Sequence, residues 1–267
     1  MQKSATTLVW TDYTSWNDII LELISDYVNH EVIDSFRTDP PKYVVSDNTG
    51  WLDRIVHRVR GFEVDVKHEL ACLLTERFDT FRTFHGCCPL DTNSYYKQGI
   101  RRLDLQEYEQ IAKDHFLSGR FPELSESDVL AAVEDMESDN RAGKVFFEAN
   151  EKMLLECCGH YMLYGSEYLL GIAATLSRRD GPDYRKSLKG IGVPTVFVCN
   201  VPFDSIAFDT ILELSGSMIE VMFEKFLDST YKHPQPGDCF GFPIRKNLPP
   251  EYIVGHYHPE YIRDPIC

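Results

Sequence analysis

The chain has 267 residues, 43% of them hydrophobic and 12% aromatic, which is enough for one large domain or for a domain with a sizeable insertion. Its 27 Lys and Arg are outnumbered by 42 Asp and Glu, and the resulting charge of −15 disfavours strong nonspecific binding to nucleic acid or anionic membrane. No apolar run reaches the roughly 18 residues of a membrane span, and residues 1–10 lack a signal-peptide core, so we expect a cytoplasmic protein.

The N-terminal region, residues 1–79, is predicted to be mainly helical. Ser15 and Asp18 form a capping-box pattern ahead of an apolar run over 19–24, and the prolines that follow Asp39 end this helical stretch. Two further amphipathic helices are predicted, one with apolar positions from Leu52 to Val59 and one with apolar positions from Val66 to Leu74.

From Thr80 onwards the sequence pattern changes from mainly helical to a mixture of strands and helices. Residues 81–86 read as a short strand that ends in a glycine turn, and residues 94–99 as a helical turn closed by Gly99. Residues 103–140 are predicted to form an acidic helical insertion, in which Ser125 and Asp128 cap the second half.

The remainder mixes strands and helices. Residues 143–149 and 192–202 are predicted strands, and the second is a continuous β-branched run. Helices are expected around 169–176 and 206–227, and the proline-rich tail from 239 to 266 is strand-like. Within this tail we expect residues 248–264 to form a strand in the centre of the sheet, with Ile253 facing inward and Glu251 at its start. This order predicts an α+β fold, and the absence of GxGxxG and GxxxxGK[ST] argues against Rossmann and P-loop nucleotide sites.

Three separated pieces of the sequence are informative together. They are His85-Gly86 with the later Gly99, then Gly159-His160-Tyr161 with Ser166 and Tyr168, and finally Leu248-Pro249-Pro250-Glu251. In this order they resemble the active-site strands of PARP-like and diphtheria-toxin-like ADP-ribosyltransferases, the His-Tyr-Glu class. The resemblance implies a split antiparallel sheet with a helical N-terminal segment and a helical insertion. Residues 80–267 would then be the catalytic domain, with Tyr161 on a strand and Glu251 on a late strand.

The resemblance also implies NAD as the substrate and nicotinamide as the leaving group. Glu251 would stabilise the oxocarbenium-like transition state at the ribose C1′. His85 would bind the adenosine ribose, and Gly86 would let the backbone approach the nicotinamide carboxamide. Tyr161 would stack on the nicotinamide ring. Ser166 and a second aromatic residue, Tyr168 or Tyr164, would complete the pocket.

Several alternatives stay open at this stage. Glu167 rivals Glu251 as the catalytic glutamate, and Tyr164 rivals Tyr161 as the stacking residue. His256 and His258 could form a metal pair on a strand, although no metal is expected. Cys87 and Cys88 directly follow Gly86 and would permit a Cys–His reading, but we interpret the eight cysteines, which include no CxxC, as reduced thiols.

The acceptor of ADP-ribose is not named by the sequence. A protein, a nucleic acid and a small molecule are all candidates, and the acidic charge slightly favours a protein or small molecule. The same site could serve an NAD glycohydrolase, and a catalytically inactive fold could serve as a binding module. A toxin or defence effector with an antitoxin or regulatory protein as its partner would fit, and no membrane partner is expected.

Overall fold

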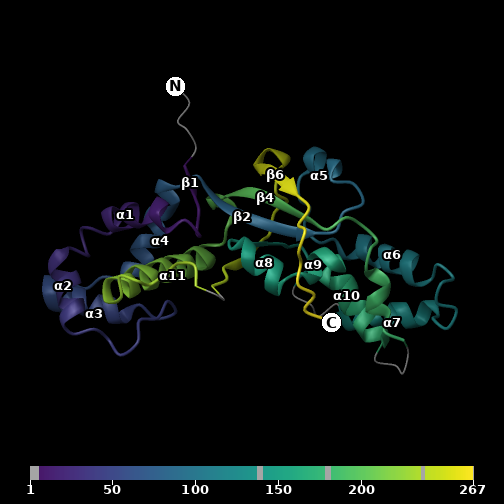
Figure 1. The fold of residues 1–267 in the computed structure, drawn as a ribbon, viewed down its shortest axis with the longest axis horizontal. Coiled ribbons are helices and arrows are strands. Elements are labelled where there is room, and N and C mark those ends of the chain that lie inside the picture. Colours follow the sequence, from purple (N-terminus) through teal and green to yellow (C-terminus); the bar gives the residue numbers. More distant parts are fainter. Residues whose placement is uncertain (1–5, 137–140, 178–181, 236–237, 267) are drawn as a thin grey trace. The chain divides into compact units, whose positions relative to one another are not determined.

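A computed structural model describes residues 6–136, 141–177, 182–235 and 238–266. Within these ranges the chain is an α+β protein with eleven α-helices and six strands, as predicted (Figure 1). The α-helices are α1 (Tyr13–Leu23), α2 (His30–Thr38), α3 (Gly50–Arg60), α4 (Val66–Arg77), α5 (Asn93–Gln98), α6 (Leu105–Phe116), α7 (Glu126–Met136), α8 (Glu151–Cys157), α9 (His160–Leu163), α10 (Glu167–Ser177) and α11 (Phe208–Leu227). The strands are β1 (Thr7–Leu8), β2 (Thr80–Cys87), β3 (Val145–Glu148), β4 (Thr195–Pro202), β5 (Gly241–Ile244) and β6 (Ile253–Tyr257).

The strands form one mostly antiparallel sheet in the order β5-β3-β2-β4-β6, and the short β1 pairs in parallel with β2. β4 is buried along most of its length, as expected for a central strand with a nearly continuous apolar run. β6 pairs antiparallel with β4, with a register shift between Val198 and Cys199. Three 3₁₀ turns complete the elements: η1 (Tyr184–Leu188), η2 (Phe203–Ser205) and η3 (Pro250–Tyr252).

The tail of the chain corrects one expectation. We expected residues 248–264 to form a central strand, but β6 has five residues and lies at the edge of the sheet. Ile253 is buried as predicted, whereas Val254 is 54% exposed, so only one face of β6 is covered. Prolines at 249, 250 and 259 flank the strand, and proline is typical of sheet edges because it cannot donate a ladder hydrogen bond.

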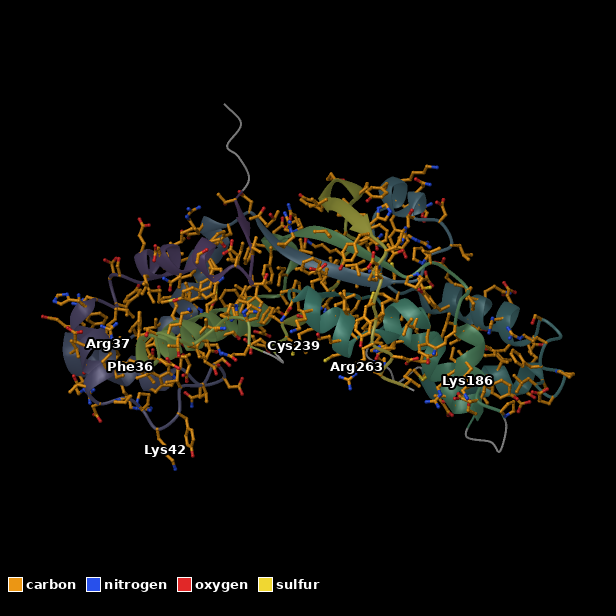
Figure 2. The ribbon with its side chains drawn as sticks, viewed as in Figure 1. Phe36, Arg37, Lys42, Lys186, Cys239 and Arg263 are labelled. Carbon is orange, nitrogen blue, oxygen red and sulfur yellow. The ribbon has the colours of Figure 1, made fainter. Side chains whose placement is uncertain are left out.

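The chain divides into two compact units. Unit 1 comprises residues 1–82 and 200–242, and unit 2 comprises residues 83–199 and 243–267. In unit 1 the N-terminal helices pack with α11, chiefly through α4. Phe36, labelled in Figure 2, packs its ring against Trp51 and Phe223 at centroid distances of 5.6 and 4.8 Å.

Unit 2 contains β3, β6 and the helices α5 to α10. α10 packs against α7 and η1, and Tyr168, Ile172 and Ala173 of α10 are buried in this cluster. α8 packs against β3, so helices accompany the strands that carry the predicted site residues. In the described ranges of both units, no helix is long and apolar enough to cross a bilayer.

Local capping signals were reliable in one place and wrong in another. The backbone N–H of Ser125 donates to the Asp128 carboxylate at 3.0 Å and the Asp128 N–H donates to Ser125 Oγ at 3.3 Å, so this capping box is confirmed. At the N-terminus, α1 already begins at Tyr13, and the Ser15 hydroxyl donates to the Asp12 carbonyl instead. The predicted helical insertion consists of α6 and α7, and residues 137–140 lie outside the described ranges.

Candidate functional site

His85 lies on β2, which pairs antiparallel with β3 at Phe84 and Glu148. Its Nδ1–H donates to the carbonyl of Phe146 at 2.9 Å, and its ring lies 5.6 Å from the ring of Phe147. Burial lowers the pKa of His85, while the hydrogen bond to Phe146 acts in the opposite direction. The imidazole is therefore neutral near pH 7, and since Nδ1 holds the proton, Nε2 is an acceptor. Nε2 has no hydrogen-bond partner in the described part of the chain.

Gly86 is buried against the helices that follow β3. A Cβ at Gly86 would lie 3.3 Å from both Leu154 Cδ1 on α8 and Met162 Cγ on α9. The space left by the missing side chain is thus filled by these two residues. Because Met162 directly follows Tyr161, this packing brings the His85-Gly86 segment beside the Gly159-His160-Tyr161 segment.

Tyr161 lies on the short helix α9, so the expectation of a strand at 159–161 is wrong. The N–H groups of Met162 and Leu163 both bond to the Gly159 carbonyl, which is helical rather than extended pairing. The Tyr161 hydroxyl donates to Glu167 Oε2 at 2.8 Å, and its ring lies 4.2 Å from that of His160. Burial raises the pKa of Tyr161, with the Glu167 charge adding to the effect.

The rival glutamate, Glu167, accepts two side-chain hydrogen bonds. Arg141 Nε and the Tyr161 hydroxyl both lie 2.8 Å from Oε2. His160 Nε2 lies 3.3 Å from Oε1 but makes no hydrogen bond there. The neighbouring His160 ring is the largest effect that lowers the pKa of Glu167, to about 2, with Tyr161 and Arg141 also lowering it against the effect of burial. We call Arg141, His160, Tyr161 and Glu167 the Glu167 cluster. Its carboxylate is already bound by Arg141 and Tyr161, which is typical of a structural ion pair.

The other predicted pocket residues are packing residues in this structure. Tyr164 and Tyr168 are 3% and 1% exposed and belong to the core around α10. The Tyr164 hydroxyl donates to Asp264 Oδ2 at 2.9 Å. Ser166 Oγ accepts the backbone N–H of Tyr168 at 3.2 Å, close to the first turn of α10. The aromatic surfaces of both tyrosines are therefore covered by other side chains.

Glu251 is exposed and lies in η3, immediately before β6. Helix α5, which follows the His85 strand, packs against η3 (Figure 1). The backbones of Ile100 and Leu248 exchange two hydrogen bonds of 2.9 Å each, N–H to carbonyl in both directions. The first and third pieces of the motif are thus brought together, although about 150 residues separate them in the sequence.

Gly99 makes this approach feasible. Its φ is +76°, and a Cβ there would lie 2.0 Å from the carbonyl oxygen of Leu248. No side chain fits at that distance, and the left-handed conformation disfavours other residues as well. Gly99 therefore closes α5, as predicted, and also allows the chain to pair with the Pro-Pro-Glu segment.

These contacts join the three segments of the motif but not the three central residues themselves. In the described ranges, no hydrogen bond, ion pair or ring contact joins any two of His85, Tyr161 and Glu251. The aromatic ring that the structure brings to His85 is Phe147, from the paired strand. Sequence reasoning predicted that strand but assigned no site residue to it, and its Phe146-Phe147 pair is the signal that could have done so.

The histidine and cysteine alternatives gain no support from their contacts. His256 Nδ1 bonds with the Tyr96 hydroxyl at 2.7 Å, and His258 Nδ1 donates to the Pro194 carbonyl at 3.1 Å. Among the described residues, no group of three or more His, Cys, Asp or Glu is arranged to hold a metal ion. Burial raises the pKa of Cys87 to about 12, so its thiol is protonated and a poor nucleophile.

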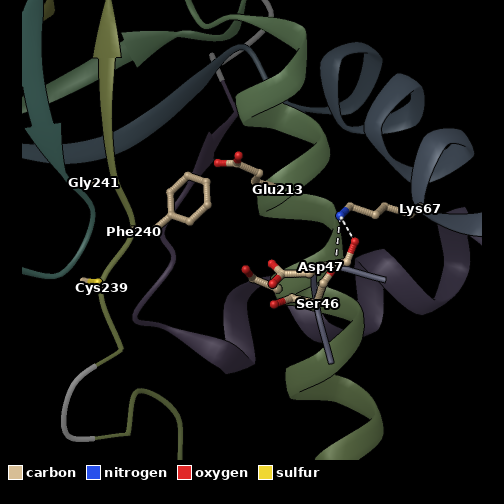
Figure 3. Close-up of a pocket in the computed structure, with 8 residues that line it drawn as sticks. Ser46, Asp47, Lys67, Glu213, Cys239, Phe240 and Gly241 are labelled. Atoms are coloured by element: carbon tan, nitrogen blue, oxygen red, sulfur yellow. Dashed lines mark hydrogen bonds between the residues drawn. The ribbon is translucent and has the colours of Figure 1, made fainter. Parts of the chain in front are cut away.

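A pocket of about 230 Å³ lies in unit 1 and contains none of the predicted site residues (Figure 3). Lys67 Nζ donates to the carbonyls of Ser46 and Asp47 at its rim, at 2.9 and 3.3 Å. The lysine thus ties the 46–47 loop to α4. This contact indicates that the Lys67 ammonium stabilises the loop and does not serve as a ligand-binding group.

Comparison of the chain with models of known protein families, with curated proteins and with solved structures found no match.

Proposed function

We propose that the chain is an NAD-dependent ADP-ribosyltransferase with its catalytic domain in residues 80–267, and that its mostly antiparallel sheet is of the ADP-ribosyltransferase type. The observation that carries the proposal is the backbone bridge between Ile100 and Leu248. It brings the segment that follows His85-Gly86 beside the segment that ends in Glu251. His85 would supply a hydrogen bond to NAD and Glu251 would supply a carboxylate for its cleavage.

His85 would bind a ribose hydroxyl of NAD. Its neutral ring presents Nε2 as an acceptor, because Nδ1–H is committed to the Phe146 carbonyl. A ribose hydroxyl can donate to this nitrogen at normal hydrogen-bond length. Phe147 supports the ring from the neighbouring strand, so the orientation of His85 is fixed before NAD binds.

Glu251 would act electrostatically. When nicotinamide leaves NAD, positive charge develops at the ribose C1′, and a carboxylate beside that carbon stabilises the transition state. Glu251 is exposed and has no ion-pair partner in the described part of the chain, so its charge is available to a substrate. Glu167, by contrast, is already paired with Arg141 and hydrogen-bonded by the Tyr161 hydroxyl.

Tyr161 would keep the role of an aromatic wall for nicotinamide, now presented from a helix. Its hydroxyl is anchored by Glu167, which fixes the ring without using its faces. The ring contacts His160 and also packs against the buried cluster of Leu154, Met162 and Val196, yet it is not fully buried. Stacking of a neutral pyridine ring on its exposed part is the expected contribution.

The test is incubation of the purified chain with NAD that carries one label in nicotinamide and another in adenine. Release of nicotinamide together with adenine label on an acceptor in a lysate supports a transferase. Release with only free ADP-ribose supports an NAD glycohydrolase. Absence of nicotinamide release from the folded protein with every acceptor supplied would contradict the proposal and favour a binding module.

A further inference from the structure

A group of positive charges forms where the Ile100–Leu248 bridge joins two short segments of unit 2. One segment carries three basic residues and the other carries two, and all five are exposed: Lys97, Arg101, Arg102, Arg245 and Lys246. The Arg102 backbone N–H also donates to Asn247 Oδ1 at 3.0 Å, so the two segments are held together beyond the bridge as well. We call these five residues the basic cluster.

The charges of the basic cluster are largely uncompensated. Arg101 pairs with Glu107 at 2.7 Å, but both partners are about half exposed, so the pair is weak. The nearby Asp104 carboxylate caps α6 by accepting two backbone N–H groups. In the described ranges the other four members have no carboxylate partner. A chain with a net charge of −15 thus has a concentrated positive area at this bridge.

A partly exposed aromatic residue immediately precedes the first member of the basic cluster in the sequence. Tyr96 precedes Lys97 on α5, is 39% exposed, and bonds through its hydroxyl to His256 Nδ1 at 2.7 Å. The hydrogen bond limits the motion of the ring while part of its surface stays open. Positive side chains next to an exposed, oriented aromatic ring are the two elements that bind single-stranded nucleic acid.

We propose that the basic cluster binds the phosphate backbone of a single-stranded nucleic acid and that Tyr96 stacks on one of its bases. Because α5 packs against η3, the bound strand would lie near Glu251 and would be the acceptor of ADP-ribose; this part rests on the proposed function. The bond between the ribose C1′ and the nicotinamide nitrogen breaks, C1′ bonds to an oxygen or nitrogen of the nucleic acid, and the displaced proton passes to solvent. Nicotinamide leaves as a neutral molecule.

The acidic charge of the whole chain does not prevent such binding. At physiological ionic strength, interactions between exposed charges are screened beyond about 8 Å, so the local cluster dominates at short range. The overall charge instead lowers affinity and suppresses nonspecific binding. This acceptor class therefore departs from the expectation that the net charge favours a protein or small molecule.

Binding is tested without NAD, by fluorescence anisotropy with a labelled single-stranded DNA of about 20 nucleotides, which exceeds the usual site size. The salt concentration is varied between roughly 50 and 200 mM. The test variant combines Arg102→Gln, Arg245→Gln and Lys246→Gln. The control combines Lys42→Gln, Arg54→Gln and Arg60→Gln, which change the net charge equally at exposed positions of unit 1; Lys42 points away from the fold in Figure 2.

The native chain and the control should bind alike, and the test variant at least tenfold more weakly. Its log–log salt slope should be smaller by about 2, since each lost phosphate contact contributes about 0.7 for a single strand. Tyr96→Ala should weaken binding about tenfold, and Tyr96→Phe much less. Equal losses in test and control, equal or tighter binding of duplex DNA, or no binding of native protein at low salt would each overturn the proposal.

The acceptor role is tested with the same oligonucleotide and adenine-labelled NAD. Transfer of label to the strand, reduced in the test variant but not in the control, supports it. If native protein releases nicotinamide but leaves the bound strand unlabelled, the acceptor assignment fails and the proposed function stands. If nicotinamide is never released, the proposed function itself fails. If the test variant only raises the KM for NAD while strand binding is unchanged, the cluster serves the NAD diphosphate and the inference is overturned.

Discussion

Gly99 and Leu248 approach so closely that the Cβ of any other residue at position 99 would lie 2.0 Å from the Leu248 carbonyl oxygen. This contact connects the end of the helix that follows His85 to the start of the segment that carries Glu251. Both the proposed active site and the basic cluster depend on it. Its loss should therefore affect stability and function together.

Gly99→Ala should destabilise the protein by more than the usual cost of a positive φ. Gly119 is the control, because its φ is +87° but a Cβ there would meet nothing within 4 Å. Gly119→Ala should cost about 1 kcal/mol from backbone conformation alone. Gly99→Ala adds a clash with backbone atoms and should lower the thermal midpoint clearly further, measured by circular dichroism. Equal midpoints for the two variants would contradict the close approach.

The Glu167 cluster predicts a loss of stability in acid. The pKa of Glu167 is lowered in the folded state to about 2 from an ordinary value of 4.5, so folding favours the charged form. This contribution is fully present above the unfolded pKa and is lost as the pH falls from about 4.5 towards 2. Each pKa unit corresponds to about 1.4 kcal/mol, so about 3 kcal/mol is an upper bound, and solvent screening of this partly exposed group reduces it.

Urea unfolding of Glu167→Gln between pH 6 and pH 3 is the measurement. The variant should be less stable than the native protein at pH 6, and the difference should shrink as the native carboxylate becomes protonated. Glu260→Gln, at an exposed position, should follow the native curve throughout. A pH-independent difference for Glu167→Gln would show that the charge of this carboxylate is not what stabilises the fold.

Several elements could be predicted because their signals are local. Gly99 at a helix end, the capping pair Ser125 and Asp128, and the β-branched run in 192–202 each determine nearby backbone through short-range sterics and hydrogen bonds. The position of β6 at the sheet edge depends on which strands pair, and no local signal reports that.

The site itself shows where local reasoning fails. Gly159-His160-Tyr161 reads equally well as a strand or as a short helix between Gly159 and Gly165. The helix is favoured by contacts distant in sequence, namely Met162 against Gly86 and the chain reversal that lets Tyr161 meet Glu167. The basic residues 101–102 and 245–246 likewise come near each other only because a backbone bridge joins distant segments.

His85 should contribute to NAD binding rather than only to chemistry. In a Glu251→Gln background, where NAD is consumed slowly, calorimetry should show weaker NAD binding for His85→Ala. His85→Asn keeps a donor for the Phe146 carbonyl but removes the Nε2 acceptor, so it should fold normally and still bind NAD about tenfold more weakly, the value of one good hydrogen bond. Normal binding by His85→Asn would limit His85 to a structural role.

Two substitutions of Tyr161 distinguish the contribution of ring stacking from that of the hydroxyl hydrogen bond. Tyr161→Phe keeps the ring but loses the 2.8 Å bond to Glu167, and should reduce stability by about 1 kcal/mol with little change in NAD affinity. Tyr161→Ala should weaken NAD binding as well. Binding is read by calorimetry and stability by urea unfolding. Unchanged NAD affinity in Tyr161→Ala would remove this residue from the site.

The central claim is tested most directly by nicotinamide release from NAD, compared between native protein, Glu251→Gln and the control Glu260→Gln. Glu251→Gln keeps the size of the side chain but removes the charge, so NAD should still bind while turnover falls by roughly 10²–10³. Glu260→Gln should turn over NAD at the native rate. Native turnover by Glu251→Gln, or no nicotinamide release by the folded native chain, would contradict the assignment.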